Sequence, residues 1–430
     1  MSYSPALSYM LDRLSGFSTN VFKLEPQGSN TAGPNNIIRI TLPANSLVNF
    51  RTFALHFDAQ TLGGVCARLP NKIDSLIERV EVTFGGVQVA AGNNYYSVLR
   101  HAKDALMGDK CDPVLGHKEI NRAISNETGL ALVADEAAAK YCINKWEGFL
   151  GTVEPQIVDL SLLPECVVSI YLTSNYVLTK SVGPSDAADF QNAGPSTPNR
   201  ATFLLQNIYA TIETVGMSDG TYDAMVSQIM SRVGFLELPF KQYVSFRDRN
   251  ANTRFSVATQ SLDRLWLVHH SANHTAEGAP ILVTGYFNAD AVQGFIGSEY
   301  SGEKYISNAF NFPQNDANAE YQLQLNGAMI PQYRAKFEDM MQISRQSIEG
   351  SPQDKHVLKT MKDNYAVFCV RLNLQNSERL RQISGLDTRG IALNGIYNIT
   401  GYDNTKDITI FAEHTSVLRV GSGLQIEVVS

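Results

Sequence analysis

The stretch 80–89, Val-Glu-Val-Thr-Phe-Gly-Gly-Val-Gln-Val, has apolar residues at every second position on both sides of a Gly85-Gly86 pair. Apolar residues with a period of two predict half-buried β-strands. Gly-Gly tolerates the positive φ angles of a two-residue hairpin turn. A helix-like run from Tyr95 to Met107 follows. The sequence therefore predicts a strand–turn–strand–helix unit.

The same unit recurs in the second half of the chain. Residues 321–325, Tyr-Gln-Leu-Gln-Leu, alternate in the same way and lead into an Asn326-Gly327 turn. A short strand at 328–331 and a helix-like run from Tyr333 to Ile348 follow. A second pair of matching segments, in the same order, is 40–57 and 255–268. Two copies of one supersecondary unit predict two domains of the same fold.

Composition limits the classes of protein that fit. The 430 residues are 44% hydrophobic and 18% charged, with a net charge of −7. Charged residues usually make up about a quarter of a chain, so this surface must be largely neutral. A neutral surface favours burial against partners. The acidic balance and the lack of a basic arm disfavour extensive binding of nucleic acid by the chain itself.

Short predicted strands separated by Gly, Pro and Asn turns fill both halves, which indicates an all-β fold of two tandem eight-stranded jelly rolls with short inserted helices. We expect an N-terminal arm at 1–17, a first jelly roll at 18–216, a connecting helix at 217–234 and a second jelly roll at 235–430. The connecting helix has an apolar stripe of Tyr222, Met225, Val226, Ile229, Met230 and Val233. An Ala-rich helix near 133–142 is expected inside a long inserted loop at 109–155.

His269-His270, with His274 and Glu277 beyond, is the best candidate for metal ligands. Adjacent residues of a strand face opposite sides of the sheet, so the first two imidazoles are not expected to share a metal. The sequence also contains no phosphate-loop or dinucleotide-binding motif. The five cysteines form no Cys-x-x-Cys pair and are expected to be buried free thiols. We therefore expect no catalytic, cofactor-binding or metal-binding residues, and no enzymatic activity.

Three segments carry a resemblance to a known family. They are 71–82 leading through Gly85-Gly86 into 94–96, the strand 203–214 with 218–223 after it, and 384–389. With these segments the chain resembles the double jelly-roll major capsid proteins of double-stranded DNA viruses, in the virophage and polinton-like virus branch and more distantly adenovirus hexon. The resemblance extends from about residue 18 to the end of the chain. The loops at 109–155, 181–200 and 288–319 are shorter than those of hexon, which argues against a tall tower.

The resemblance implies a structural viral capsid protein that forms a homotrimer with a pseudo-hexameric outline and tiles an icosahedral shell. Implied partners are neighbouring capsomers and minor capsid or penton proteins. The implied location is the virion, with assembly in the host cytoplasm or nucleus, to which free cysteines are suited. The alternatives are a bicupin-like metalloenzyme and a tandem jelly-roll carbohydrate-binding protein.

Two further expectations concern the genome and membranes. A basic cluster, Lys241, Arg247, Arg249, Arg254 and Arg264, is interleaved with Asp248 and Asp263 and is expected to form a solvated or intersubunit face rather than a DNA site. The segment 5–16, with an apolar stripe of Leu7, Met10, Leu11 and Leu14, is a candidate for contact with an internal membrane. No signal peptide and no membrane-spanning stretch are expected.

Overall fold

The structure, a computed structural model, describes residues 17–62, 67–70, 73–90, 94–107, 138–180, 202–217, 226–228, 231–232, 234–271, 281–282, 305–306, 310, 312–348, 361–362, 365–373, 385–390, 393–421 and 423–430. The segment 5–16 and most of the predicted connecting helix lie outside these residues. Of that helix, 226–228 and 231–232 are described and are helical.

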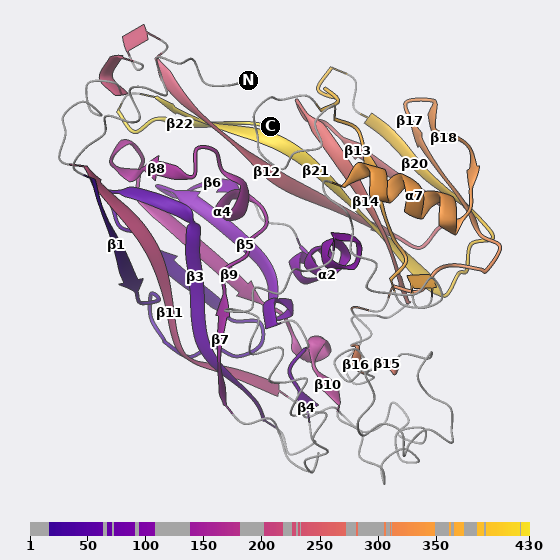
Figure 1. Cartoon of the computed structure of the whole chain (residues 1–430), viewed down its shortest axis with the longest axis horizontal. Coiled ribbons are helices and arrows are strands. Elements are labelled where there is room, and N and C mark those ends of the chain that lie inside the picture. The colour runs from indigo at the N-terminus through magenta and orange to yellow at the C-terminus, as the bar shows by residue number, and fades with distance from the viewer. Residues whose placement is uncertain are drawn as a thin grey trace.

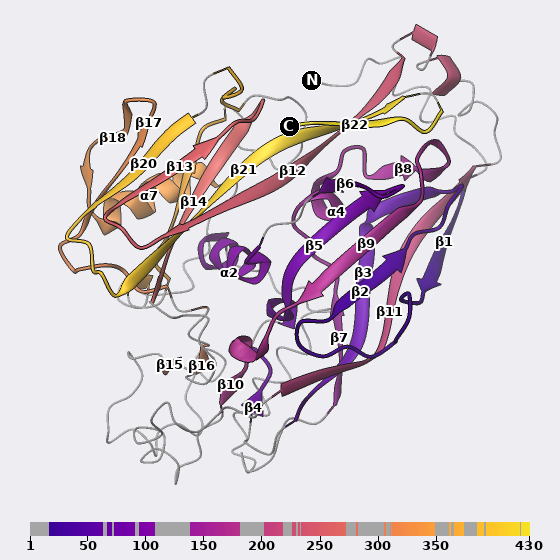
Figure 2. The same cartoon turned by 180° about the vertical axis from the view of Figure 1, so that it is seen from behind.

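The first half of the chain forms two antiparallel sheets (Figure 1, indigo to magenta). One sheet has the order β1 (Phe17–Leu24), β11 (Thr202–Met217), β3 (Leu47–Leu62), β7 (Ala139–Ile143), and short β8 (Ile157–Asp159) also pairs with β3. The other has the order β2 (Ile37–Thr41), β9 (Cys166–Leu172), β5 (Ile77–Phe84), β6 (Val87–Ala90). The second sheet comes forward when the molecule is seen from behind (Figure 2).

The second half repeats this arrangement strand for strand. One sheet has the order β12 (Phe235–Asp248), β21 (Lys406–Gly421), β14 (Leu262–Ser271), β19 (Val367–Arg371), and short β22 (Ile426–Val429) also pairs with β21. The other has the order β13 (Asn252–Val257), β20 (Leu393–Thr400), β17 (Glu320–Leu325), β18 (Ala328–Ala335). Each half has eight main strands in its two large sheets, if short β8 and β22 are left out. The first, third, sixth and last of these eight strands share one sheet. This order is that of a jelly roll, and the predicted all-β duplication is confirmed.

Small elements complete the described residues. Two-stranded sheets pair β4 (Ala67–Arg68) with β10 (Thr179–Lys180) and β15 (Ile281–Leu282) with β16 (Tyr305–Ile306). The helices are α2 (Tyr96–Met107), α4 (Phe149–Thr152) and α7 (Phe337–Ser347), with single 3₁₀ turns η1 (Ile73–Leu76), η2 (Leu160–Leu162) and η3 (Asn175–Val177). None of the described helices is long and apolar enough to cross a membrane.

The two predicted hairpin turns have the expected backbone. Gly85 and Gly86 have φ angles of 56° and 83°, and Asn326 and Gly327 have φ angles of 48° and 90°. Positive φ at both central positions is the twist that joins two right-twisted strands without splaying them. The following helix starts at Tyr96 in the first half, close to its predicted start. In the second half β18 continues to Ala335, so the helix begins four residues later than predicted, at Phe337.

Two sequence expectations for 109–155 are wrong in the part that the structure describes. Residues 139–143 form the strand β7 on the edge of the first sheet, where an Ala-rich helix was predicted. Residues 149–152 form α4, whose Phe149 and Leu150 are buried in the core. The alternation of buried Tyr141 and Ile143 with more exposed neighbours is a strand pattern that the alanines obscured.

The helix α2 lies between the two halves in both views (Figures 1 and 2). It contacts η1 and β5 of its own half and β19 of the other half. No side chain from Tyr96 to Leu106 is fully exposed: Val98, Leu99, Ala102 and Leu106 are buried, and His101, Asp104 and Ala105 are half-buried. An amphipathic surface helix would leave one face in water. The helix α2 is therefore part of the junction between the two jelly rolls.

Candidate functional site, a buried ionic junction between the two jelly rolls

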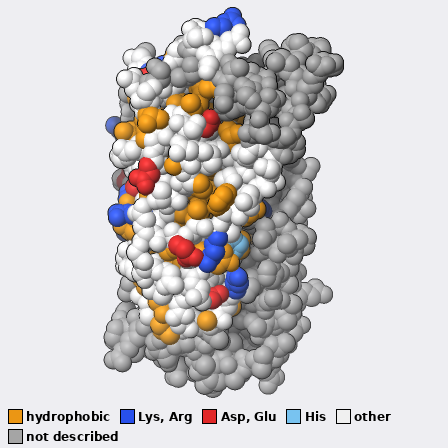
Figure 3. All heavy atoms as spheres, turned by 90° about the vertical axis from the view of Figure 1, so that its left-hand side faces the viewer, with side chains coloured by type: hydrophobic (Ala, Val, Ile, Leu, Met, Phe, Trp, Pro, Cys, Tyr) orange, Lys and Arg blue, Asp and Glu red, His pale blue; other side chains and the backbone are white. Residues whose placement is uncertain are grey.

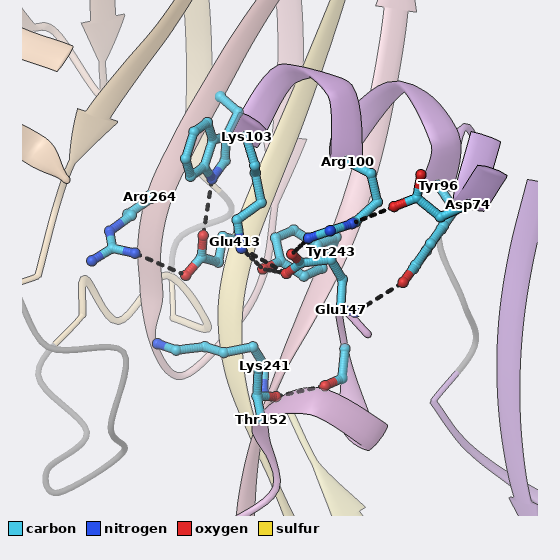
Figure 4. Close-up of polar contacts among 12 residues, drawn as sticks. Asp74, Tyr96, Arg100, Lys103, Glu147, Thr152, Lys241, Tyr243, Arg264 and Glu413 are labelled. Carbon is cyan, nitrogen blue, oxygen red and sulfur yellow. Dashed lines mark hydrogen bonds and ion pairs between the residues drawn. The ribbon is translucent and has the colours of Figure 1, made fainter. Parts of the chain in front are cut away.

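The carboxylate of Glu147 is the centre of the junction (Figure 4). It accepts hydrogen bonds from Arg100 Nη1 at 2.9 Å and Lys103 Nζ at 2.6 Å, both from α2, and from the Tyr243 hydroxyl on β12 at 3.0 Å. Arg100 Nε also donates to Asp74 Oδ2 at 3.1 Å. Residues far apart in the sequence, and from both jelly rolls, therefore meet at one buried carboxylate.

Local sequence explains why these groups converge. Arg100 and Lys103 are three positions apart, which places them on the same side of the helix. The backbone N–H of Glu147 donates to the hydroxyl of Tyr96 at 3.0 Å, which holds the carboxylate opposite that side. The chain then turns at Gly148, with a φ of 76°, and continues into α4. A positive φ at this point favours glycine because it carries no Cβ.

At the junction, two buried cations balance the charge of the Glu147 carboxylate. Burial on its own would raise the pKa of Glu147, but Lys103 and Arg100 outweigh burial and lower the pKa to about 2. Burial is also the main cause that raises the pKa of Tyr96 above its ordinary value. A carboxylate held ionised by two cations is neither a general acid nor a general base near neutral pH. The arrangement therefore joins two domains rather than performing chemistry.

Further buried pairs continue the network into the second jelly roll. Lys241 Nζ lies 2.6 Å from Asp263 Oδ2 and donates to Thr415 Oγ1 at 2.9 Å. Arg264 Nη1 lies 3.6 Å from Glu413 Oε1, and Trp266 Nε1 donates to Glu413 Oε2 at 2.9 Å. These pairs lie on β12, β14 and β21.

The predicted basic surface cluster is wrong for two of its members. Lys241 and Arg264 are buried and paired, since they face the junction instead of solvent. Arg247 and Arg249 both bind the carboxylate of Asp407, at 2.5 Å and 2.6 Å. Arg254 is exposed on β13. The cluster is thus divided among separate ion pairs and does not form one basic face.

Backbone and aromatic contacts close the same junction. Glu154 N donates to Pro239 O at 2.9 Å, and Lys241 N donates to Thr152 Oγ1 at 2.8 Å, so β12 accepts one hydrogen bond and donates another along its outer edge. Figure 4 shows the second contact beside the ionic network. The rings of Phe149 and Phe240 meet edge to face with centroids 4.9 Å apart.

Of the histidine candidate for metal binding the structure describes His269 and His270, and these two have separate surroundings. His269 Nδ1 lies 3.0 Å from Ala366 O, which can only accept, so Nδ1 donates and Nε2 accepts from the Tyr397 hydroxyl at 3.1 Å. The ring of the adjacent His270 packs edge to face against that of Phe312. The two histidines therefore have different neighbours. Within the described ranges no group of three or more His, Cys, Asp or Glu could hold a metal ion. His274 and Glu277 lie outside those ranges.

Two of the described cysteines and both tryptophans lie in the core. Cys166 and Cys369 are buried free thiols, as predicted, and Cys142 is a half-buried free thiol. Burial raises the pKa of Cys369 to about 12, which keeps the thiol protonated and unreactive. Both tryptophans, Trp146 and Trp266, are buried. They therefore form no exposed aromatic platform for a sugar.

Sequence reasoning missed the group at Glu147. The helix 95–107 was predicted, but Arg100 and Lys103 were not singled out within it. A signal was present: Arg100 follows Val98 and Leu99, and Lys103 follows Ala102, so each cation lies next to apolar residues of the predicted helix. Their partner follows 44 to 47 residues later, beyond the range of local patterns.

The chain is similar to known proteins in structure and not in sequence. No protein-family model and no curated protein matches the sequence. By structure the chain is similar to a chain of the PBCV-1 virus capsid, at 13% identity and a TM-score of 0.60, with 97% of this chain and 98% of that chain covered. It is similar to the Faustovirus major capsid protein at 10% identity and a TM-score of 0.54, with 94% and 90% covered.

A chain in the structure of the Sputnik virophage is also similar, at 12% identity and a TM-score of 0.54, with 96% of this chain and 89% of that chain covered. The alignments include both halves, so the match is to the whole tandem arrangement and not to one sandwich. The repeated strand order and this coverage together show that the chain has the double jelly-roll fold of these viral proteins.

Proposed function

We propose that the chain is a structural capsid protein, without enzymatic activity, that forms the outer shell of a virion. The observation that carries the proposal is the tandem of two jelly rolls with identical strand order, matched over nearly its whole length by viral capsid chains. A jelly roll alone hosts many functions, so the fold by itself would be a weak argument. The ionic junction adds support because its buried hydrogen bonds and ion pairs join the two rolls.

We further propose that three copies form a trimer whose six jelly rolls give a pseudo-hexameric outline, and that trimers tile an icosahedral shell. Two similar rolls in each chain supply the approximate sixfold repeat that such a unit needs. The low proportion of charged residues supports large contacts with neighbouring copies and with minor or penton proteins. Free thiols are consistent with assembly in a reducing host compartment.

Electron microscopy of the purified chain tests this proposal. The expected particles have a hexagonal outline with three-fold symmetry, and they associate side by side into sheets or shells. Single particles of one chain with no tendency to associate at high protein concentration would contradict it. Metal analysis of the same preparation distinguishes the bicupin alternative, which requires bound metal in stoichiometric amount.

We propose also that the chain does not hold the genome directly. The described cations of the predicted basic cluster are mostly used in ion pairs, which leaves no concentrated basic face among them. Binding to duplex DNA should therefore be weak at physiological salt. Submicromolar affinity that falls steeply as salt is added would overturn this, because that slope reports neutralised phosphates.

A further inference from the structure

Histidines are buried in one jelly roll and not in the other. Among the described residues the buried histidines are His269, His270 and His414, on the strands β14 and β21 of the second roll, and each is at most 4% exposed. In the first half His56 on β3 and His101 on α2 are only half-buried. Histidine is the side chain whose ordinary pKa lies between neutral and mildly acidic pH. The two rolls therefore differ in where mild acid can create a buried charge.

The imidazole of His269 lies between the two sheets of the second roll and is fully buried. Its Nδ1 donates to Ala366 O, just before β19 of the same sheet, at 3.0 Å. Its Nε2 accepts from the Tyr397 hydroxyl, on β20 of the opposite sheet, at 3.1 Å. The ring centroids of Tyr321 on β17 and Phe368 on β19 lie 5.5 Å and 5.4 Å from that of the imidazole. The neutral ring therefore connects the two sheets through a hydrogen bond among aromatic side chains.

Protonation of His269 disturbs this core in two ways. Protonated Nε2 is a donor and can no longer accept from the Tyr397 hydroxyl, so the hydrogen bond between the sheets has to exchange donor and acceptor. The imidazolium is also a buried charge, which is costly unless it is paired. Burial is the main cause that lowers the pKa of His269 to about 4. The neutral ring thus stabilises the fold fully above pH about 6.5, and this contribution is lost as pH falls toward 4.

Charged and titratable groups around the ring do not offset that cost. From β21 the positive charge of Lys406 acts against protonation of the imidazole. From β17 and β20 the ring meets the phenols of Tyr321 and Tyr397, and burial raises the pKa of both, so they stay neutral. The carboxylates of Asp316 and Glu338 act on the Tyr321 hydroxyl.

The first roll responds less to the same change of pH. His56 lies on the outer face of its sheet, where it stacks on Tyr209 and shares a hydrogen bond with Thr211. Figure 3 shows the side of the molecule on which this face lies, with a histidine side chain visible at the surface. Burial lowers the pKa of His56 too, but water reaches a half-buried ring, so its protonation costs less. Glu147 at the junction, with a pKa of about 2, stays ionised throughout this range.

We propose that mild acid loosens the second jelly roll before the first, and that protonation of His269 is the trigger. The inference goes beyond the proposed function and does not rest on it. A chain with this property is stable at neutral pH. Within a shell it would lose the support of its second roll in an acidic compartment, while its first roll stays folded.

The two tryptophans allow each roll to be followed separately, since Trp146 lies in the first half, Trp266 lies in the second, and both are buried. Trp146→Phe leaves Trp266 as the reporter, and Trp266→Phe leaves Trp146. Urea unfolding of each variant, followed by fluorescence, is compared with itself at pH about 7 and about 4.5. In acid the unfolding equilibrium constant reported by Trp266 should rise on the order of 50-fold, and that reported by Trp146 should rise much less.

His269→Gln in the Trp146→Phe chain tests the trigger. Glutamine does not titrate, so most of the acid shift of the Trp266 transition should be lost. His56→Gln is the matched control, because it removes a half-buried imidazole of the first roll, and it should leave that shift in place. An acid shift that survives His269→Gln, or one that His56→Gln abolishes, would overturn the proposal. Equal acid shifts in the two reporters would also overturn it.

Hydrogen exchange of the unmodified chain keeps the test decisive if a substituted chain does not fold. Labelling times are adjusted for the effect of pH on the intrinsic exchange rate. At pH about 4.5 the amides of β14, β17 and β20 should lose protection, while those of β3, β5 and β9 keep theirs. Loss of protection in both rolls together, or first in the first roll, would contradict the proposal.

Discussion

The sheet β1-β11-β3-β7 and the sheet β12-β21-β14-β19 have the same strand order but different surroundings. From Asp407 to Leu418 every residue of β21 is buried, so both faces of this strand are covered. In β11, buried residues such as Ala210 and Ile212 alternate with half-exposed residues such as Tyr209 and Thr211. The first roll covers one of these sheets, and among the described residues the equivalent sheet of the first roll is less covered. Equal topology therefore does not imply equal burial.

The covered sheet contains many buried charges, and this determines its sensitivity to substitution. Lys241, Asp263, Arg264 and Glu413 are all buried on it. Removal of one partner from a buried ion pair leaves an uncompensated charge, which costs far more than loss of an exposed pair. The largest effects should therefore come from the junction and smaller ones from the hairpins.

Glu147→Leu should have the largest effect. It leaves Arg100 and Lys103 buried without their shared carboxylate, and we expect a loss of about 3–5 kcal/mol in the free energy of unfolding. Denaturant unfolding measures this loss. Glu237→Gln is the matched control, because its pair with Arg419 is exposed and should be worth at most about 1 kcal/mol. If Glu147→Leu lowered the free energy of unfolding no more than Glu237→Gln does, the buried junction would contribute no more to stability than an exposed ion pair.

Acid should destabilise the fold in two stages. Burial lowers the pKa of His269 to about 4, and burial also lowers the pKa of His414 and His56. A neutral histidine in the folded state must be protonated on unfolding, so its contribution is complete above pH about 6.5 and declines as pH falls toward 4. Glu147, with a pKa of about 2, contributes above pH about 4.5 and loses that contribution as pH falls toward 2.

Chemical unfolding at a series of pH values tests the first stage. The free energy of unfolding should fall on the order of 3 kcal/mol between pH about 6.5 and 4 from His269 alone. His269→Gln should flatten that slope, whatever its effect at neutral pH, since glutamine does not titrate. A slope that is the same in the variant and the wild type would assign the pH dependence to other groups.

The two hairpins allow a smaller, paired comparison. Gly86→Val and Gly327→Val should each lower the free energy of unfolding by about 1–3 kcal/mol, since both residues have a positive φ that valine resists. An added Cβ meets no atom within 4 Å at either position, so the cost comes from the backbone alone. Thermal unfolding measures it. Unchanged melting temperatures would mean that these turns can relax to negative φ.

Sequence patterns predicted the elements that depend on local rules. The hairpins at Gly85-Gly86 and Asn326-Gly327 and the helix after each were recognisable because turn residues and a period of two coincide there. The strand β1 was missed, since Ser18, Thr19 and Asn20 interrupt the apolar pattern of an edge strand. β7 was assigned to a helix because alanines precede it.

The candidate site could not be predicted in the same way. Lys241 and Arg264 were assigned to the surface because charged residues are rarely buried unless they are paired. Their partners, Asp263 and Glu413, are brought to them by the register of β12, β14 and β21. Such pairing depends on the tertiary fold, and no local period in the sequence contains it.

The mass of the purified chain in solution, measured by light scattering at micromolar concentration, tests the central claim most directly. If the chain forms the proposed trimer, the particle should have three times the chain mass of 47.3 kDa, with no monomer present. A folded particle of 47.3 kDa that does not change with concentration would contradict the account, because a chain that stays single does not build a shell.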